Sequence, residues 1–347
     1  MIQFFMSNFH KEREVGSLRR LDELLESLPT ICRRFFMGVA QTTAPLTRLA
    51  YAYDLRMFFD FLLREVAEFH GKDLAGFEVG DLEKVEVFHI ELYVDFLAKG
   101  LQMNARNGER AIVRKLSCLR AFFKYFFKKG LIKANIMPNI DLPKLREKPI
   151  VRLDGGEVAR LLEVTDEGVG LTKGQLRFHE ATKLRDETIV MFFLTTGIRI
   201  SELVGLNTGD IDLERGSFRV TRKGGSQVIL YMPDDLKNQL VLYLGGDMGA
   251  SAEEPLFMSL QNKRISVRAV QDLVKKYAKL AAPLKNISPH KLRSTFGTNL
   301  YRATKDIYVV ADVLGHRDVN TTKKHYAAIS DDVRKEAAGK VKILEEG

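Results

Sequence analysis

The chain has 347 residues, of which 45% are hydrophobic and 29% charged, a composition typical of a globular protein of about two domains. It has no apolar run of the roughly 18 residues that a membrane helix needs, and its first residues lack the basic start and the cleavage site of a signal peptide. We therefore expect a cytoplasmic protein with no membrane partner. The two cysteines, Cys32 and Cys118, do not form paired zinc ligands. We predict that both are buried free thiols and that no metal is bound.

The N-terminal part predicts a small helical domain. Residues 46–66 and 87–99 have the apolar periodicity of helices, and no segment before residue 135 predicts a strand with confidence. We assign residues 30–135 to this domain and treat residues 1–29 as an N-terminal extension.

A third predicted helix, which starts near Ile112, separates apolar residues from cations. Leu116, Leu119, Phe123 and Phe126 share one stripe at about 100° per residue. The opposite face carries Arg110, Arg114, Arg120, Lys124 and Lys128. Between residues 106 and 148 the chain has twelve Lys or Arg against three acidic residues, an excess equal to its whole net charge of +9. Such a localised excess predicts DNA binding, and a solvated basic surface is the alternative.

Two prolines, Pro138 and Pro143, end the helical periodicity, so we place a basic interdomain linker at residues 136–150. We expect a second domain over residues 151–329, with a polar loop or short insertion at 165–181 and a hairpin at 210–232. Its predicted helices cover residues 155–164, 186–195, 201–206, 233–243, 266–281, 289–301, 306–314 and 320–329. The tail, residues 330–347, is predicted to be a polar helix with an apolar stripe.

Several short motifs in this second domain carry candidate chemistry. His290 and Arg293 are three residues apart at a predicted helix start, where both side chains and the helix N-terminus can face one phosphate. Arg199 follows a helix-ending glycine, and Glu202 is placed to hold its guanidinium. His316 follows a Leu-Gly turn, and Tyr326 comes ten residues later. Taken singly, each motif is also compatible with ordinary surface or core residues.

The ordered set resembles the tyrosine recombinases, which include Xer resolvases and phage-type integrases. The set consists of Thr-Gly-Ile-Arg-Ile-Ser-Glu-Leu, a hairpin with Lys-Gly, His-Lys-Leu-Arg, Leu-Gly-His and the later tyrosine. The resemblance covers residues 30 to 330. It implies a mainly α fold with a small β-hairpin or sheet, in which a helical core-binding domain and an α+β catalytic domain form a C-shaped clamp on DNA.

The resemblance also assigns roles to residues of this chain. The catalytic set would be Arg199, Lys223, His290, Arg293, His316 and the nucleophile Tyr326, with Glu202 in support. Arg222 stands where many relatives have glycine. The enzyme would need no cofactor, would bind a double-stranded recombination site as a tetramer, and would associate with the nucleoid. The tail would then dock on a neighbouring copy, although it could equally fold back on its own chain.

Two other functions are compatible with parts of this pattern. One is a type IB topoisomerase-like relaxer, which uses the same chemistry as a monomer. The other is a catalytically silent DNA-binding protein of the same fold, which the presence of all six catalytic residue types argues against.

Overall fold

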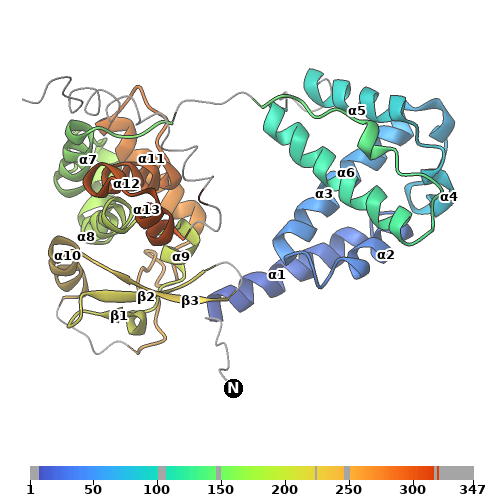
Figure 1. The fold of residues 1–347 in the computed structure, drawn as a ribbon. Helices are drawn as coiled ribbons and strands as arrows, with labels where there is room; N and C mark the ends of the chain where they lie inside the picture. Colours follow the sequence, from blue (N-terminus) through green and yellow to red (C-terminus); the bar gives the residue numbers. More distant parts are fainter. Residues whose placement is uncertain are drawn as a thin grey trace, which may run out of the picture. The chain divides into compact units, whose positions relative to one another are not determined.

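The computed structural model describes residues 8–100, 107–145, 150–222, 225–245, 251–315 and 319 (Figure 1). The chain divides into two compact units, an N-terminal unit of Asn8–Glu147 and a C-terminal unit that begins at Lys148. The helices predicted over residues 320–329 and in the tail lie outside the described residues. Among the described helices, none combines the length and the apolar character needed to cross a membrane.

The described part of the N-terminal unit is built from helices. They are α1 (Asn8–Leu25), α2 (Thr30–Gly38), α3 (Pro45–Glu65), α4 (Val79–Leu82), α5 (Val87–Lys99) and α6 (Glu109–Lys128). Helix α3 contacts α1, α5 and α6 and is therefore the centre of the unit (Figure 1). The predicted helices at 46–66 and 87–99 are confirmed as α3 and α5, and the basic helix is confirmed as α6.

The core of this unit consists largely of phenylalanine rings. Phe122 of α6 is fully buried, and its ring centroid lies 5.2 Å from Phe35, 6.0 Å from Phe59 and 4.9 Å from Phe126. All three contacts are edge-on, the arrangement that aromatic rings prefer. Helices α2, α3 and α6 are thus joined through one aromatic cluster.

Both cysteines lie in this core as free thiols. Burial raises the pKa of Cys32 and of Cys118, because a thiolate would lose its hydration there. The prediction of buried free thiols is confirmed.

The limits of the N-terminal unit differ from those expected from the sequence. Residues 8–29, which we expected to form an extension, belong to the unit, because α1 packs on α3 and buries Leu21 and Leu25 in the common core. At the other end, Met137 and Ile140 are also buried in this core. The first residues of the predicted linker 136–150 therefore belong to the folded unit.

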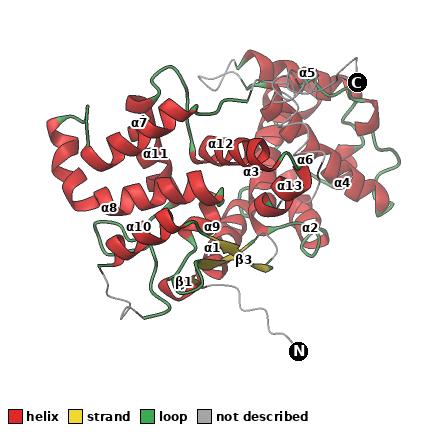
Figure 2. Ribbon diagram, turned by 60° about the vertical axis from the view of Figure 1, so that its left-hand side comes forward, coloured by secondary structure: helices red, strands yellow, loops and turns green. Residues whose placement is uncertain are grey.

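The C-terminal unit combines helices with one small sheet. Its helices are α7 (Gly155–Glu167), α8 (Lys173–Thr196), α9 (Ile200–Val204), α10 (Asp234–Leu244), α11 (Val267–Ala281), α12 (Pro289–Thr304) and α13 (Ile307–Leu314). Helix α8 contacts α7, α10 and α12, which makes it the central helix (Figure 2). The mainly helical fold class with a small sheet is confirmed.

The sheet has three antiparallel strands in the order β1 (Ile211–Asp212), β2 (Ser217–Thr221) and β3 (Gln227–Tyr231). The predicted hairpin is β2–β3. The two-residue strand β1 pairs with the other edge of β2 and makes the sheet three-stranded. Phe218 and Val220 of β2 are buried, and the Phe218 ring packs edge-on against Phe192 of α8 at 5.3 Å. The sheet is therefore fixed to the central helix by its middle strand.

Residues 165–181 are not the loop that we expected. Helix α7 continues to Glu167, and α8 already begins at Lys173, where Thr172 and Gln175 form a capping box. The buried side chains of this first half of α8 are polar. His179 Nδ1 is hydrogen-bonded to the Tyr277 hydroxyl at 3.0 Å, and this hydroxyl donates to the buried Asp186 at 3.0 Å. Hydrogen bonds thus replace apolar contacts between α8 and α11.

Candidate active site

Arg199 lies immediately before α9, two residues after the glycine that ends α8. Its backbone N–H donates to Oε2 of Glu202 at 2.9 Å, and its guanidinium donates to Oε1 at 2.8 Å. Glu202 is buried, whereas the Arg199 side chain is 36% exposed. The predicted contact between the two residues is therefore present. The Glu202 carboxylate holds the Nη1 atom of the guanidinium, and part of the Arg199 side chain stays exposed to solvent.

His290 and Arg293 lie on the first two turns of α12, which starts at Pro289. The proline restrains the first turn without loss of a helical hydrogen bond. His290 is exposed, whereas Arg293 is only 7% exposed. The guanidinium of Arg293 donates to the carbonyl oxygens of Gly197 and Leu314. A buried cation that is held by two backbone carbonyls has a fixed orientation.

The C-terminal end of α13 brings these arginines together. The last carbonyls of a helix have no partner within it and carry the negative end of the helix dipole. Here Leu314 O accepts from Arg293, and Gly315 O accepts from Arg199 at 2.8 Å. The two acceptors are consecutive in the chain, so both guanidinium groups are held at the same helix end. The next residue along the chain is His316.

Gly197 occupies the junction of α8, α12 and α13. Its φ of +61° is in the left-handed region, where glycine is favoured as a helix cap. Space also requires glycine, because a Cβ there would lie 2.3 Å from the Phe296 ring and 2.8 Å from Leu314. The close packing allows Gly197 O to reach Arg293.

Three residues of the expected catalytic set, Lys223, His316 and Tyr326, lie outside the described residues, so their roles stay predictions. The described members come from two segments, Arg199 and Glu202 from the start of α9 and His290 and Arg293 from α12. The end of α13 joins Arg199 and Arg293. Within the described ranges, no group of three or more His, Cys, Asp or Glu is arranged to hold a metal ion.

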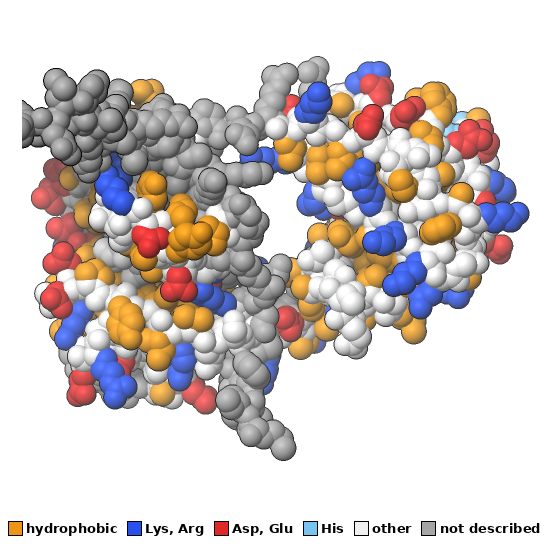
Figure 3. Space-filling model, in the orientation of Figure 1, with side chains coloured by type: hydrophobic (Ala, Val, Ile, Leu, Met, Phe, Trp, Pro, Cys, Tyr) orange, Lys and Arg blue, Asp and Glu red, His pale blue; other side chains and the backbone are white. Residues whose placement is uncertain are grey.

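The cationic face of α6 is divided between two environments. Arg110, Lys124 and Lys128 are exposed. Arg114 makes a bidentate contact with the buried Asp54 of α3, one arm of which measures 2.7 Å, and Arg120 donates to the backbone of Ile140. These last two cations, predicted as DNA contacts, are thus also bound within the unit. Figure 3 shows further Lys and Arg side chains distributed over the visible face of this unit.

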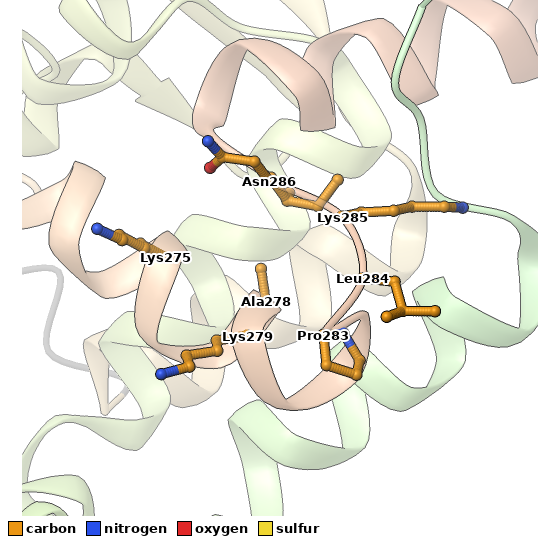
Figure 4. A pocket seen from close by; sticks show the side chains of 8 residues that line it. Lys275, Ala278, Lys279, Pro283, Leu284, Lys285 and Asn286 are labelled. Atoms are coloured by element: carbon orange, nitrogen blue, oxygen red, sulfur yellow. The ribbon is translucent and has the colours of Figure 1, made fainter.

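A pocket of about 340 Å³ lies elsewhere in the C-terminal unit, between the end of α11 and the loop before α12 (Figure 4). Lys275, Lys279 and Lys285 are among its lining residues. The lining includes none of the expected catalytic residues, and Lys285 is bound to the backbone of Arg152 and to the carboxylate of Glu157. The pocket is therefore separate from the candidate active site.

One cation of the arrangement was missed as a site residue. Arg222 departs from the usual glycine, and its side chain donates to Val313 O at 3.1 Å, one residue before the acceptor of Arg293. A backbone acceptor leaves no signal in a sequence, so only the fold could reveal this contact.

Known proteins place this architecture in a family. The model of the phage integrase family matches residues 152–332, more than half of the chain. Tyrosine recombinase XerC of Caldanaerobacter subterraneus is 31% identical over 331 residues, covering 92% of this chain and 88% of that protein. Tyrosine recombinase XerC of Thermodesulfovibrio yellowstonii is 32% identical, covering 80% and 84%. The chain therefore belongs to the phage integrase family and is a Xer-like tyrosine recombinase, an enzyme that breaks and rejoins DNA strands.

Solved structures agree with this fold. The XerH recombinase in its post-cleavage complex with a palindromic difH substrate has a TM-score of 0.61 at 18% identity, covering 87% of this chain and 82% of that one. A lambda integrase tetramer bound to a Holliday junction has a TM-score of 0.62 at 15% identity, covering 85% and 76%. At these identities the likeness concerns the fold alone.

Proposed function

We propose that this chain is a site-specific recombinase that cuts double-stranded DNA with Tyr326, forms a 3′-phosphotyrosyl link and passes the strand to a second partner. The observation that carries the proposal is the placement of Arg199 and Arg293 at consecutive carbonyls of one helix end. Two guanidinium groups held at one helix end could together bind the non-bridging oxygens of one phosphodiester. His316, the next residue after these carbonyls, would add a further donor.

The chemistry follows from the residue types. Negative charge grows on the non-bridging oxygens as the phosphate is attacked, and fixed cations stabilise that charge. A tyrosine hydroxyl has a pKa of about 10 and is protonated at neutral pH, so it needs a base. His290, exposed one helical turn before Arg293, would accept that proton as the Tyr326 oxygen bonds to phosphorus. The bond to the 5′ oxygen breaks, and Lys223 would supply the proton to that oxygen.

This scheme needs neither ATP nor a metal ion. The phosphotyrosyl link keeps the energy of the broken phosphodiester, so a 5′ hydroxyl from another strand can reverse the reaction. Fixed guanidinium and imidazole groups take the place that a divalent cation has in other phosphoryl-transfer enzymes.

The substitution Tyr326→Phe tests the nucleophile. It removes one hydroxyl, so cleavage should be lost while DNA binding stays within about twofold of the wild type. The substrate is a nicked fragment of a site selected for binding to the protein, and the covalent adduct is measured on a denaturing gel, with and without EDTA. An adduct in the variant would identify another nucleophile, and a strict need for magnesium would exclude the proposed chemistry.

We also propose that recombination requires four copies on paired sites, with the tail from residue 330 docked on a neighbouring copy. A short apolar stripe buries enough surface, at roughly 25 cal/mol per Å², to support a reversible contact of a few kcal/mol. Truncation after Asp332 should leave single-site binding intact but abolish cooperative assembly on two sites. Unchanged strand exchange by the truncated protein would contradict tail docking. Relaxation of supercoils without any exchange by the full chain would favour a topoisomerase-like activity.

A further inference from the structure

Arg222 lies at the base of the β2–β3 turn, directly after β2. Its backbone N–H donates to Ser226 O at 2.8 Å, and its carbonyl accepts from the N–H of Gly225 at 3.0 Å. These two bonds close the turn. The side chain of Arg222 therefore leaves the hairpin from a fixed point of the backbone.

The guanidinium of Arg222 packs on the C-terminal turn of α13. Its Nη2 donates to Val313 O at 3.1 Å, across 91 residues of sequence. A Cβ added at Gly315 would fall 1.9 Å from Nη1 and 2.2 Å from Cζ, so the guanidinium is in direct contact with the glycine backbone. The Nε atom is buried and has no hydrogen-bond partner in the part of the chain that the structure describes. The side chain is therefore enclosed at this point.

Three successive carbonyls at the end of α13 thus accept from three arginines of different segments. Val313 O accepts from Arg222, Leu314 O from Arg293 and Gly315 O from Arg199. Each bond satisfies a carbonyl that the helix itself leaves unpaired, and together the three cations oppose the negative end of the helix dipole. The arrangement joins the hairpin, α12 and the start of α9 at one turn.

We propose that Arg222 is a positioning residue of the active site, which holds the end of α13 against the base of the hairpin so that Arg199 and Arg293 keep their mutual geometry. The inference rests on the proposed function. Arg222 acts through the turn, because its guanidinium donates to Val313 O and packs on the backbone of Gly315. Loss of its bond frees Val313 O and allows the turn to shift, and displacements of about 1 Å in such sites lower rates by about 100-fold.

The substitution Arg222→Met tests this role, because methionine keeps an unbranched apolar stem and removes the donors and the charge. Arg219→Met is the matched control, since Arg219 lies on β2 three residues before Arg222, is half exposed and pairs with Asp210. With all DNA bound, we expect Arg222→Met to slow single-turnover cleavage by about 10- to 100-fold and Arg219→Met to change it by less than about twofold.

Two further readouts separate positioning from other roles. The dissociation constant and its salt dependence should not change in Arg222→Met, whereas a lost phosphate contact would lower the log–log salt slope by about 1 and overturn the inference. The circular dichroism spectrum at the assay temperature should match that of the wild type. A slow rate accompanied by loss of folded protein would reduce Arg222 to a structural residue.

A double-mutant cycle with Gly315→Ala tests the route of the effect. The alanine methyl would displace the guanidinium, so the double variant should be no slower than the slower single variant. Rate losses that multiply would show that the two residues act independently. If the wild type forms no phosphotyrosyl adduct, the proposed function fails; if it does and Arg222→Met forms it equally fast, only this inference fails.

Discussion

The two units hold their helices together by different means. In the N-terminal unit, Phe122 meets three other rings in an apolar cluster, a contact that depends on shape and area but has little directionality. In the C-terminal unit, the helix ends around Gly197 and Leu314 are joined by a buried guanidinium that donates to their carbonyls. Hydrogen bonds of this kind fix angles as well as distances. Directional hydrogen bonds therefore orient the candidate site, whereas the aromatic core is held by contacts that need no such direction.

The N-terminal unit also contains a buried ion pair. Asp54 of α3 has a side chain that is only 3% exposed, and it is paired with Arg114 and, at 3.6 Å, with the buried Lys115. This ion pair fixes α3 to α6 as the arginine bonds fix α12 to α13. The Asp54 pair can therefore be compared with the arginine bonds of the candidate site, because it joins two helices in the same way but lies outside the expected catalytic set.

The largest effect is expected for Arg293→Gln, which removes the cation that we propose binds the phosphate and two donors to backbone carbonyls. Cleavage at saturating DNA should fall by about 1,000-fold or more, since loss of a single transition-state donor alone costs about 100- to 1,000-fold. Stability should fall by about 1–3 kcal/mol through the unpaired carbonyls of Gly197 and Leu314. Single-turnover cleavage and urea unfolding measure the two effects. If the variant lost stability but cleaved DNA at the wild-type rate, the bonds of Arg293 would serve stability alone, like the ion pair of Asp54.

A smaller effect, confined to stability, is expected for Asp54→Asn. The change leaves Lys115 buried without its carboxylate, so the N-terminal unit should lose roughly 2–4 kcal/mol, less than for a fully buried pair because Arg114 is half exposed. Cleavage by folded, DNA-bound protein should stay within about threefold. Asp60→Asn on the same helix is the control, because Asp60 and Arg56 form an exposed pair that contributes less than about 1 kcal/mol. Equal unfolding free energies for the two variants would refute the role of Asp54.

The smallest effect per residue is expected on the exposed face of α6. Neutralisation of Arg110, Lys124 and Lys128 to Gln, one at a time, should weaken DNA binding and lower the log–log salt slope by about 1 for each lost phosphate contact. Arg114 is left unchanged, because its loss would also disturb Asp54. Fluorescence anisotropy at several salt concentrations measures the slope. A constant slope in all three variants would mean that this face does not meet DNA.

The sequence predicted those elements whose buried side chains are apolar. Helices α3, α5 and α6 and the β2–β3 hairpin follow apolar periodicity, and the structure confirms them. The first half of α8 does not follow apolar periodicity, because its buried positions include His179 and Thr182, which are buried through hydrogen bonds. The pair Thr172 and Gln175 was the available signal, since a capping box marks a helix start.

The candidate site was predictable in its residue types and less so in its geometry. The spacing of Arg199 and Glu202 was enough to expect their ion pair. The acceptors of Arg222 and Arg293 are main-chain oxygens, which every residue possesses and which therefore leave no pattern. Helix α1 was not predicted for a different reason, since eight of its 18 residues are charged and Leu21 and Leu25 mark the buried side only near its end.

Gly197 has a consequence for how mutational data on this enzyme should be interpreted. Asparagine, the usual second choice at a left-handed helix cap, is excluded here because any Cβ meets the Phe296 ring. A saturation library selected for recombination should therefore return glycine alone at this position, as strictly as it returns arginine at Arg293. A residue with no functional group would then be scored beside Arg293, because it provides the space and the carbonyl that Arg293 needs.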